Sequence, residues 1–204
     1  TVATGPSAGD YLPIAYGDCF NVTPLLINGT THVYQVSDIE IHAVTLVKDN
    51  GAGPVAHTAD LVAGTITLTG APVGNITADI VGVKISGAAI VKAGEIIDHI
   101  ITTRTDLPSE YYDAAAFTAL DVEIDWEHNV YVSGRTTARQ VIDQILESIG
   151  AKLSRTETGA ITVANNAALV GGQNIVHAFN CLHFRGRRSS NCFFYIFAGP
   201  GIIK

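Results

Sequence analysis

The sequence has no methionine, three cysteines and few charged residues, and each scarcity limits what the chain can be. Cys19, Cys181 and Cys192 are odd in number and far apart, so they predict free thiols and assembly in a reducing cytoplasm. The net charge of −7 argues against specific nucleic-acid binding, which needs a basic face. No apolar run reaches the roughly 18 to 20 residues that span a bilayer. The missing methionine and the start at Thr1 indicate a processed chain or a segment of a longer one.

The length and hydrophobic content of the chain are sufficient for a packed core. With 204 residues, 47% of them hydrophobic and 15% charged, the chain should form one or two globular domains. Residues 1–10 are small, polar and contain glycine and proline, which predicts a linker or arm that becomes ordered only against a neighbouring subunit.

Residues 11–90 have the pattern of an antiparallel β domain. Short runs rich in valine, isoleucine and threonine alternate with turn residues, and Asn28-Gly29 gives a strong hairpin signal between two of them. Pro24 makes the first of these strands an edge or bulged strand. The runs that we interpret as strands are 22–27, 32–36, 39–48, 64–69 and 76–85.

Residues 91–165 predict a second, α+β domain. A helical stripe of isoleucines occupies residues 92–104, and a second helix should start at Pro108 with its apolar face ending at Leu120. Residues 122–132 then read as a strand that carries the only tryptophan. The fold class is therefore α+β and β-rich, with about three helices on a short sheet after the β domain.

The clearest unit in the chain is a helix followed by a hairpin. Thr137 and Gln140 form a capping box, and Gly150 is placed for a left-handed helix end. The apolar stripe between them comprises Ala138, Val141, Ile142, Ile145, Leu146 and Ile149. Residues 151–155 and 160–163 can then pair across a glycine-containing turn, which gives the stripe a sheet to cover.

This unit resembles one in the tail-tip, or baseplate hub, proteins of long-tailed bacteriophages, in which a helix ending in "IGA" leads into a strand, an acidic turn with glycine and a second strand. Residues 12–27 and 32–51 are similar to the middle of the same proteins, so that the resemblance covers most of residues 11–165. It implies an internal segment of a homotrimeric hub that forms a ring below the tail tube and links it to host-contacting proteins. Its partners would be the tube, tape measure and fibre proteins, its location the virion, and the segment would have no catalytic role and no cofactor.

Candidate site residues were weighed against structural roles. Glu123, Asp125 and Glu127 would share one face of the predicted strand, where they could do acid–base work, bind calcium or, as we favour, form a solvated face. Trp126, on the other face, would anchor the core or a subunit contact. Ile145 and Gly150 complete the structural candidates in this part of the chain.

Residues 166–204 differ in composition from the rest. His177, Cys181, His183 and Cys192 are zinc-ligand types, but their spacing matches no known zinc pattern, so we predict no metal site. Phe193, Phe194 and Phe197 belong to an aromatic run that should contact a subunit, dock in the core, or reflect a non-native reading frame.

Three functions stay open from the sequence. The first is the structural tail-tip component. The second is a receptor- or glycan-binding module of a tail fibre, with contact to the host cell surface. The third is a cell-wall hydrolase, although the common catalytic motifs are absent from the sequence.

Overall fold

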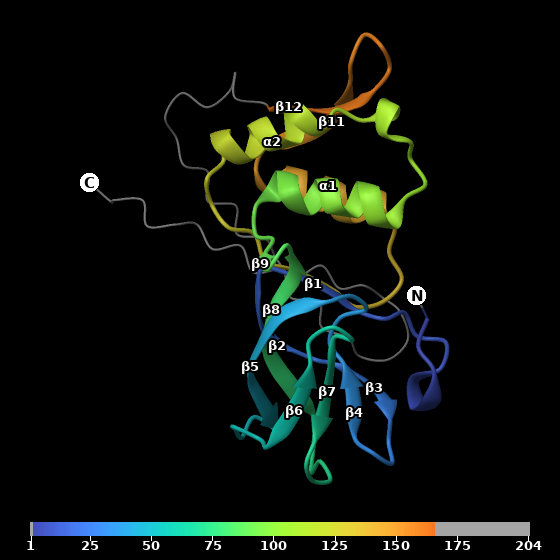
Figure 1. The fold of residues 1–204 in the computed structure, drawn as a ribbon, viewed down its shortest axis with the longest axis vertical. Helices are drawn as coiled ribbons and strands as arrows, with labels where there is room; N and C mark the ends of the chain where they lie inside the picture. The colour runs from blue at the N-terminus through green and yellow to red at the C-terminus, as the bar shows by residue number, and fades with distance from the viewer. Residues whose placement is uncertain (1, 166–204) are drawn as a thin grey trace, which may run out of the picture. The chain divides into compact units, whose positions relative to one another are not determined.

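The computed structural model describes residues 2–165 and divides them into two compact units. The first unit contains residues up to Ile90 together with Asn129–Arg135, and the second contains Val91–His128 and the residues from Thr136 onward. Within the described residues the fold is strand-rich α+β, with three α-helices and several antiparallel sheets, which confirms the predicted class (Figure 1).

Two four-stranded sheets build the first unit (Figure 1). One has the order β2–β8–β5, with the short β9 paired to the end of β8, and the other has the order β3–β4–β7–β6. Their strands are β2 (Asp18–Val22), β3 (Leu25–Asn28), β4 (Val33–Gln35), β5 (Ile41–Asp49), β6 (His57–Asp60), β7 (Thr65–Leu68), β8 (Ile76–Ile85) and β9 (Ala88–Ala89). All the pairings are antiparallel, as the sequence predicts.

Apolar side chains from both sheets form one core. Val36, Ile41, Val47 and Ile66 have no exposed surface, and their neighbours in the cluster come from β2, β4, β5, β7 and β8. The Asn28-Gly29 hairpin is confirmed, but its loop runs from Gly29 to His32, since the Asn28 carboxamide oxygen accepts the backbone N–H groups of two threonines that follow it. The strand predicted at 76–85 has the bounds of β8.

Four strands of this unit were not predicted: β1 (Ile14–Tyr16), β2, β6 and β9. β1 pairs with β10 (Val130–Val132), which occupies only the end of the strand predicted at 122–132. β6 has the polar sequence HTAD, with little of the strand signal. β1 lies close to β8 at Gly82, where a Cβ atom would meet the carbonyl of Ala15, and the Gly82 N–H donates to the Gly17 oxygen at 2.7 Å. The absence of a side chain at Gly82 therefore allows β1 to lie next to β8.

The prediction for residues 1–10 is wrong for the part that the structure describes. A 3₁₀ turn (η1, Gly5–Ser7) packs on β3, the Ala3 N–H donates to the Asp10 oxygen at 2.7 Å, and Ala3 is buried. Gly5 has φ 72°, and a Cβ atom there would collide with the Ile27 carbonyl. The arm is therefore ordered by its own chain, because a glycine lets it lie directly against a strand.

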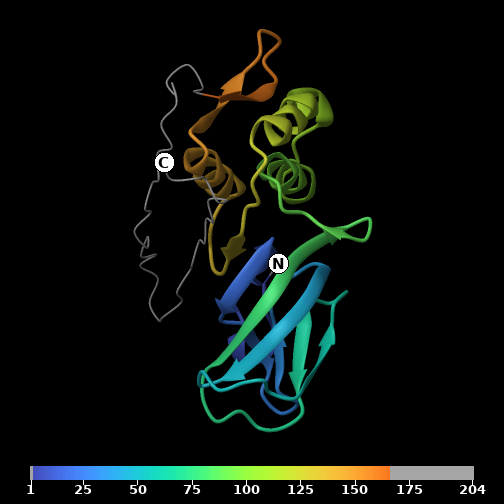
Figure 2. The same ribbon diagram turned by 90° about the vertical axis from the view of Figure 1, so that its left-hand side faces the viewer.

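Three helices and a hairpin build the second unit, and Figure 2 views the helices close to end-on. The helices are α1 (Ala93–Arg104), α2 (Ala114–Glu123) and α3 (Ala138–Ser148), with a 3₁₀ turn, η2 (Ser109–Tyr111), before α2; the hairpin strands are β11 (Ala151–Arg155) and β12 (Ile161–Asn165). α1 contacts both α2 and α3, while β11 lies along α3 and β12 along α2. The predicted isoleucine stripe of α1 is buried.

Helix α3 and its hairpin have the predicted structure. The Gln140 N–H donates to Thr137 Oγ1 at 3.2 Å and the Thr137 N–H to Gln140 Oε1 at 3.0 Å, which completes the capping box. Gly150 has φ 71°, the conformation expected for a left-handed helix end. Of the predicted stripe, Val141, Ile142, Ile145 and Leu146 are buried, whereas Ala138 and Ile149 at its two ends are half-buried.

Helices α1 and α2 approach each other at Gly94. A Cβ atom at Gly94 would overlap the Phe117 carbonyl, so only glycine allows this separation. The Asp121 carboxylate then accepts the Gly94 and Glu95 N–H groups at 2.5 and 2.9 Å, and so caps α1 from the neighbouring helix. Burial raises the pKa of Asp121, against the opposing effect of these two hydrogen bonds.

Candidate functional site

The acidic stretch does not form the predicted strand. The helix predicted from Pro108 is present as α2 but begins only at Ala114, where the Asp113 side chain caps it by accepting the Ala116 N–H. It continues to Glu123, with Phe117 and Leu120 buried as one helical face. The alternation of acidic residues in this stretch was therefore misread as a strand. β10 begins only at Val130. Glu123, Asp125 and Glu127 therefore do not share a strand face. Paired acid–base catalysis and calcium binding were both suggested from that shared face, so the structure gives no geometric support for either role.

One of the three carboxylates has a specific partner. The Asp125 carboxylate pairs with the Lys92 ammonium group, which immediately precedes α1. The hydrogen bond to Lys92 lowers the pKa of Asp125 and raises that of Lys92. Both groups are solvated, so we attribute to them orientation of the chain rather than a large stabilisation.

His128 is the buried titratable group at the end of this stretch. Its side chain is 2% exposed, and its Nε2 atom has no hydrogen-bond partner among the described residues. Burial, with a contribution from Lys92, lowers the pKa of His128 to about 4, so that the ring is neutral at pH 7. No motif in the sequence marks this histidine as buried, since a lone histidine beside acidic residues is more often solvated.

The other structural candidates are placed as follows. Trp126 is 41% exposed, which excludes the core position offered for it and leaves the subunit-contact interpretation untested. Ile145 is 3% exposed in the centre of the α3 stripe. Gly150 ends α3, and nothing lies near the position that a Cβ atom would take. Phe193, Phe194 and Phe197 lie outside the described residues.

Cys19 is a buried thiol. Its Sγ atom donates toward the carbonyl oxygens of Tyr16 and Val130, at 3.4 and 3.6 Å. Burial raises the pKa of Cys19 to about 12, so almost no thiolate exists at neutral pH. A nucleophile or metal ligand needs the thiolate. Cys19 is therefore a core residue, in agreement with its expected free state.

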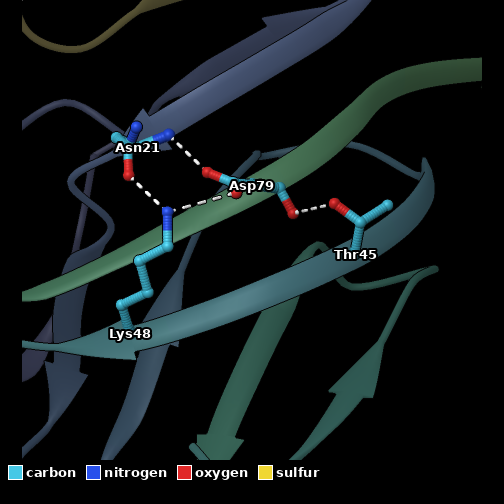
Figure 3. Close-up of polar contacts among 4 residues, drawn as sticks. All are labelled: Asn21, Thr45, Lys48 and Asp79. Atoms are coloured by element: carbon cyan, nitrogen blue, oxygen red, sulfur yellow. Dashed lines mark hydrogen bonds and ion pairs between the residues drawn. The ribbon is translucent and has the colours of Figure 1, made fainter. Parts of the chain in front are cut away.

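A polar cluster on β8 was not predicted (Figure 3). The Asp79 carboxylate accepts the Asn21 N–H at 2.6 Å and lies 3.4 Å from the Lys48 ammonium group, which also donates to Asn21 Oδ1 at 2.7 Å. Thr45 Oγ1 donates to the Asp79 carbonyl oxygen at 3.0 Å. Both strands beside β8 are irregular here, between Cys19 and Val22 and between Val44 and Leu46.

The chemistry of this cluster is structural. Asn21 has φ 52°, in the left-handed region that asparagine enters more readily than most other non-glycine residues, and its N–H is turned toward the Asp79 carboxylate. Each bulge leaves backbone groups without a regular ladder partner, and side chains from the adjacent strands supply the missing partner. Sequence patterns cannot show such a site, because its hydrogen-bonded partners are 27 to 58 residues apart on different strands and none belongs to a local motif.

A second carboxylate has a similar role. Asp49, at the end of β5, accepts the N–H groups of Val73 and Gly74 at 2.6 and 2.7 Å. This holds the loop before β8 beside the turn that contains Gly53 and Pro54, and a shallow, open hollow lies between them. Asp49, Asp79 and Asp121 thus all serve as acceptors for backbone N–H groups.

Among residues 2–165, no group of three or more histidine, cysteine or acidic side chains could hold a metal ion. The zinc-type residues His177, Cys181, His183 and Cys192 lie outside that range. No helix in the described part of the chain is long and apolar enough to cross a membrane. Comparison of the chain with models of known families, with curated proteins and with solved structures finds no match.

Proposed function

We propose that the chain is a structural segment of a bacteriophage tail tip, which assembles as a homotrimeric ring below the tail tube and binds other tail proteins. The observation that carries this proposal is the helix and hairpin of residues 137–165. Its helix end at Ile149 and Gly150, followed by the paired strands β11 and β12, has the order of elements on which the resemblance to tail-tip proteins depends.

The use of charged side chains supports the proposal. Asp49, Asp79 and Asp121 all accept backbone N–H groups at irregular points of the fold. Carboxylates that stabilise loops and a helix end in this way are consistent with a structural protein that presents surfaces to its neighbours. Trp126, which is 41% exposed, is the aromatic side chain that we assign to such a contact, since tryptophan is enriched at interface hot spots.

The first experiment measures assembly. The full 204-residue chain, studied by sedimentation velocity and native mass spectrometry over a range of concentrations, should form a trimer. Each contact should bury at least about 1,000 Å² in total, the usual lower limit for a specific interface. Peptides of this chain should also be found by mass spectrometry in purified particles of the phage that encodes it.

Variants test the surface. Trp126→Ala should shift the equilibrium toward monomer with an unchanged circular dichroism spectrum, while Tyr111→Ala, which removes another exposed aromatic of the same unit, should leave assembly unchanged. A chain that stays monomeric at every concentration and is absent from particles would refute the proposal. Specific binding on a glycan array by that monomer would instead favour the receptor-binding function.

A further inference from the structure

The segment after α2 is tied to the residues that enter α1 at two points. The His128 N–H donates to the Val91 oxygen at 2.7 Å, and the Asp125 carboxylate pairs with Lys92. Ile124, directly before the first tie, is buried, and its N–H donates to the Leu120 oxygen. Residues 124–128, which we call the clasp, therefore lie over the start of α1.

The surroundings of His128, at the buried end of the clasp, suit only the neutral form of its imidazole ring. The imidazole of His128 is almost completely enclosed, and Nε2 has no partner among the described residues. In the neutral ring one nitrogen can remain an acceptor without a partner at modest cost. In the charged ring both nitrogens are donors, so Nε2 would become a buried donor on a cation without an acceptor.

We infer that the clasp is an acid-sensitive device: in mildly acidic solution His128 takes up a proton, and residues 124–128 release the start of α1. The inference does not depend on the proposed function. It rests on the enclosure of the ring, the unpartnered Nε2 and the two ties that the ring lies beside.

The surrounding charges favour release. Lys92 is the charged group that acts on His128, and its positive charge opposes protonation of the ring. Asp121, Asp125 and Glu127 act on Lys92 in turn. Because Lys92 lowers the pKa of Asp125 below its ordinary value, protonation of Asp125 does not itself open the Lys92–Asp125 tie over the range in which the released ring titrates. The acid response of the clasp is therefore assigned to His128 rather than to Asp125.

The size of the response follows from linkage. The ring has an ordinary pKa of 6.5 when released and a pKa of about 4 when enclosed, so the released form binds more protons between these values. Closure is fully favoured above about pH 6.5 and is weakened progressively as the pH falls to about 4. Over that window the opening equilibrium should rise roughly 100-fold.

Hydrogen exchange followed by mass spectrometry tests this in the full chain. After correction for the intrinsic pH dependence of exchange, protection of peptides that cover residues 124–128 and the start of α1 should fall roughly 100-fold between pH 7 and pH 4. Peptides from β8, in the first unit, should lose much less protection. Equal loss in β8 would mean unfolding of the whole chain and would overturn the inference.

Two variants isolate the histidine. His128→Gln cannot be protonated and should retain its protection at pH 4, while His42→Gln, at an exposed position of β5, should behave like the wild type. The same acid-induced loss in His128→Gln would overturn the inference. If His128→Gln does not fold, NMR titration of the wild-type ring decides, since a midpoint near the ordinary 6.5 would equally overturn it.

Discussion

Replacing Gly94 by alanine tests how closely α1 and α2 pack, because two effects of opposite sign act at this position. Helix propensity favours alanine over glycine by about 1 kcal/mol. Packing opposes it, since the new Cβ atom would overlap the Phe117 carbonyl and come within 2.8 Å of the Asp121 carboxylate. The carbonyl belongs to the backbone of α2 and cannot rotate away as a side chain would.

The packing effect should win. Inserting a methyl group against a fixed backbone costs about 1–3 kcal/mol. Moving the helices apart also lengthens the two hydrogen bonds from Gly94 and Glu95 to Asp121, and a lost helix cap costs about 1 kcal/mol. After the gain in propensity is subtracted, Gly94→Ala should lower the free energy of unfolding by about 1–3 kcal/mol.

Urea unfolding followed by circular dichroism at 222 nm, where the helices dominate, measures this difference. Gly70→Ala is the matched control, because nothing lies within 4 Å of its added Cβ atom and its φ is not positive. That variant should be neutral or slightly stabilised, through a less flexible unfolded chain. An unfolding midpoint of Gly94→Ala at or above that of the wild type would refute the close packing of the two helices.

Three further outcomes are expected. Ile145→Asp should abolish cooperative unfolding of the second unit, because an unpaired carboxylate on the buried stripe costs several kcal/mol; a soluble variant with the wild-type melting temperature would mean that the stripe is exposed. Gly150→Val should lower the unfolding free energy by about 1 kcal/mol or more, since φ is 71° there, and an unchanged midpoint would contradict that conformation. Cys19 should react with iodoacetamide at pH 8 at least about 100-fold more slowly in the folded chain than in urea, and peptide mapping that finds equal rates would show an accessible thiol.

The sequence was sufficient where a local pattern decides the structure. The capping box of Thr137 and Gln140, the stripe around Ile145 and the turn at Gly150 act within one or two helical turns, and all three have the predicted form. The strand at 76–85 was equally clear, because it is long and rich in β-branched residues.

Prediction from the sequence failed where a contact between residues far apart in the chain determines the local structure. The helix expected from Pro108 was found as α2, but it continues to Glu123, where the alternation of acidic and apolar residues after Val122 suggested a strand; the strand begins only at Val130. β1 depends on the missing side chain of Gly82, and the order of the N-terminal arm depends on Gly5 against Ile27. Glycines that allow two segments to pack closely do not change the hydrophobic periodicity of the sequence, so the pattern does not reveal them.

The candidate site was the least predictable part for the same reason. The Asp79 cluster joins Asn21, Thr45 and Lys48 from strands β2 and β5, and no two of these residues share a motif. The distances separate two interactions of the Asp79 carboxylate, its hydrogen bond to the Asn21 N–H and its ion pair with Lys48. The Asn21 N–H lies 2.6 Å from one carboxylate oxygen, while Lys48 lies 3.4 Å from the other. We therefore expect the bond to the bulged backbone, rather than the ion pair, to account for most of its effect on stability.

Three single variants and one double variant test this division. Asp79→Asn keeps an oxygen for the Asn21 N–H and should cost less than about 1 kcal/mol, whereas Asp79→Ala leaves that N–H without its partner and should cost about 1–3 kcal/mol. Lys48→Met removes the cation and keeps most of the side-chain volume; its coupling to Asp79→Asn in a double-mutant cycle should be about 0.2–1 kcal/mol, as for a partly solvated ion pair. Unfolding free energies from urea titrations supply all four corners of the cycle. If Asp79→Asn is as damaging as Asp79→Ala and the coupling to Lys48 accounts for the loss, the carboxylate acts through its charge, and the bulge at Asn21 keeps its conformation without it.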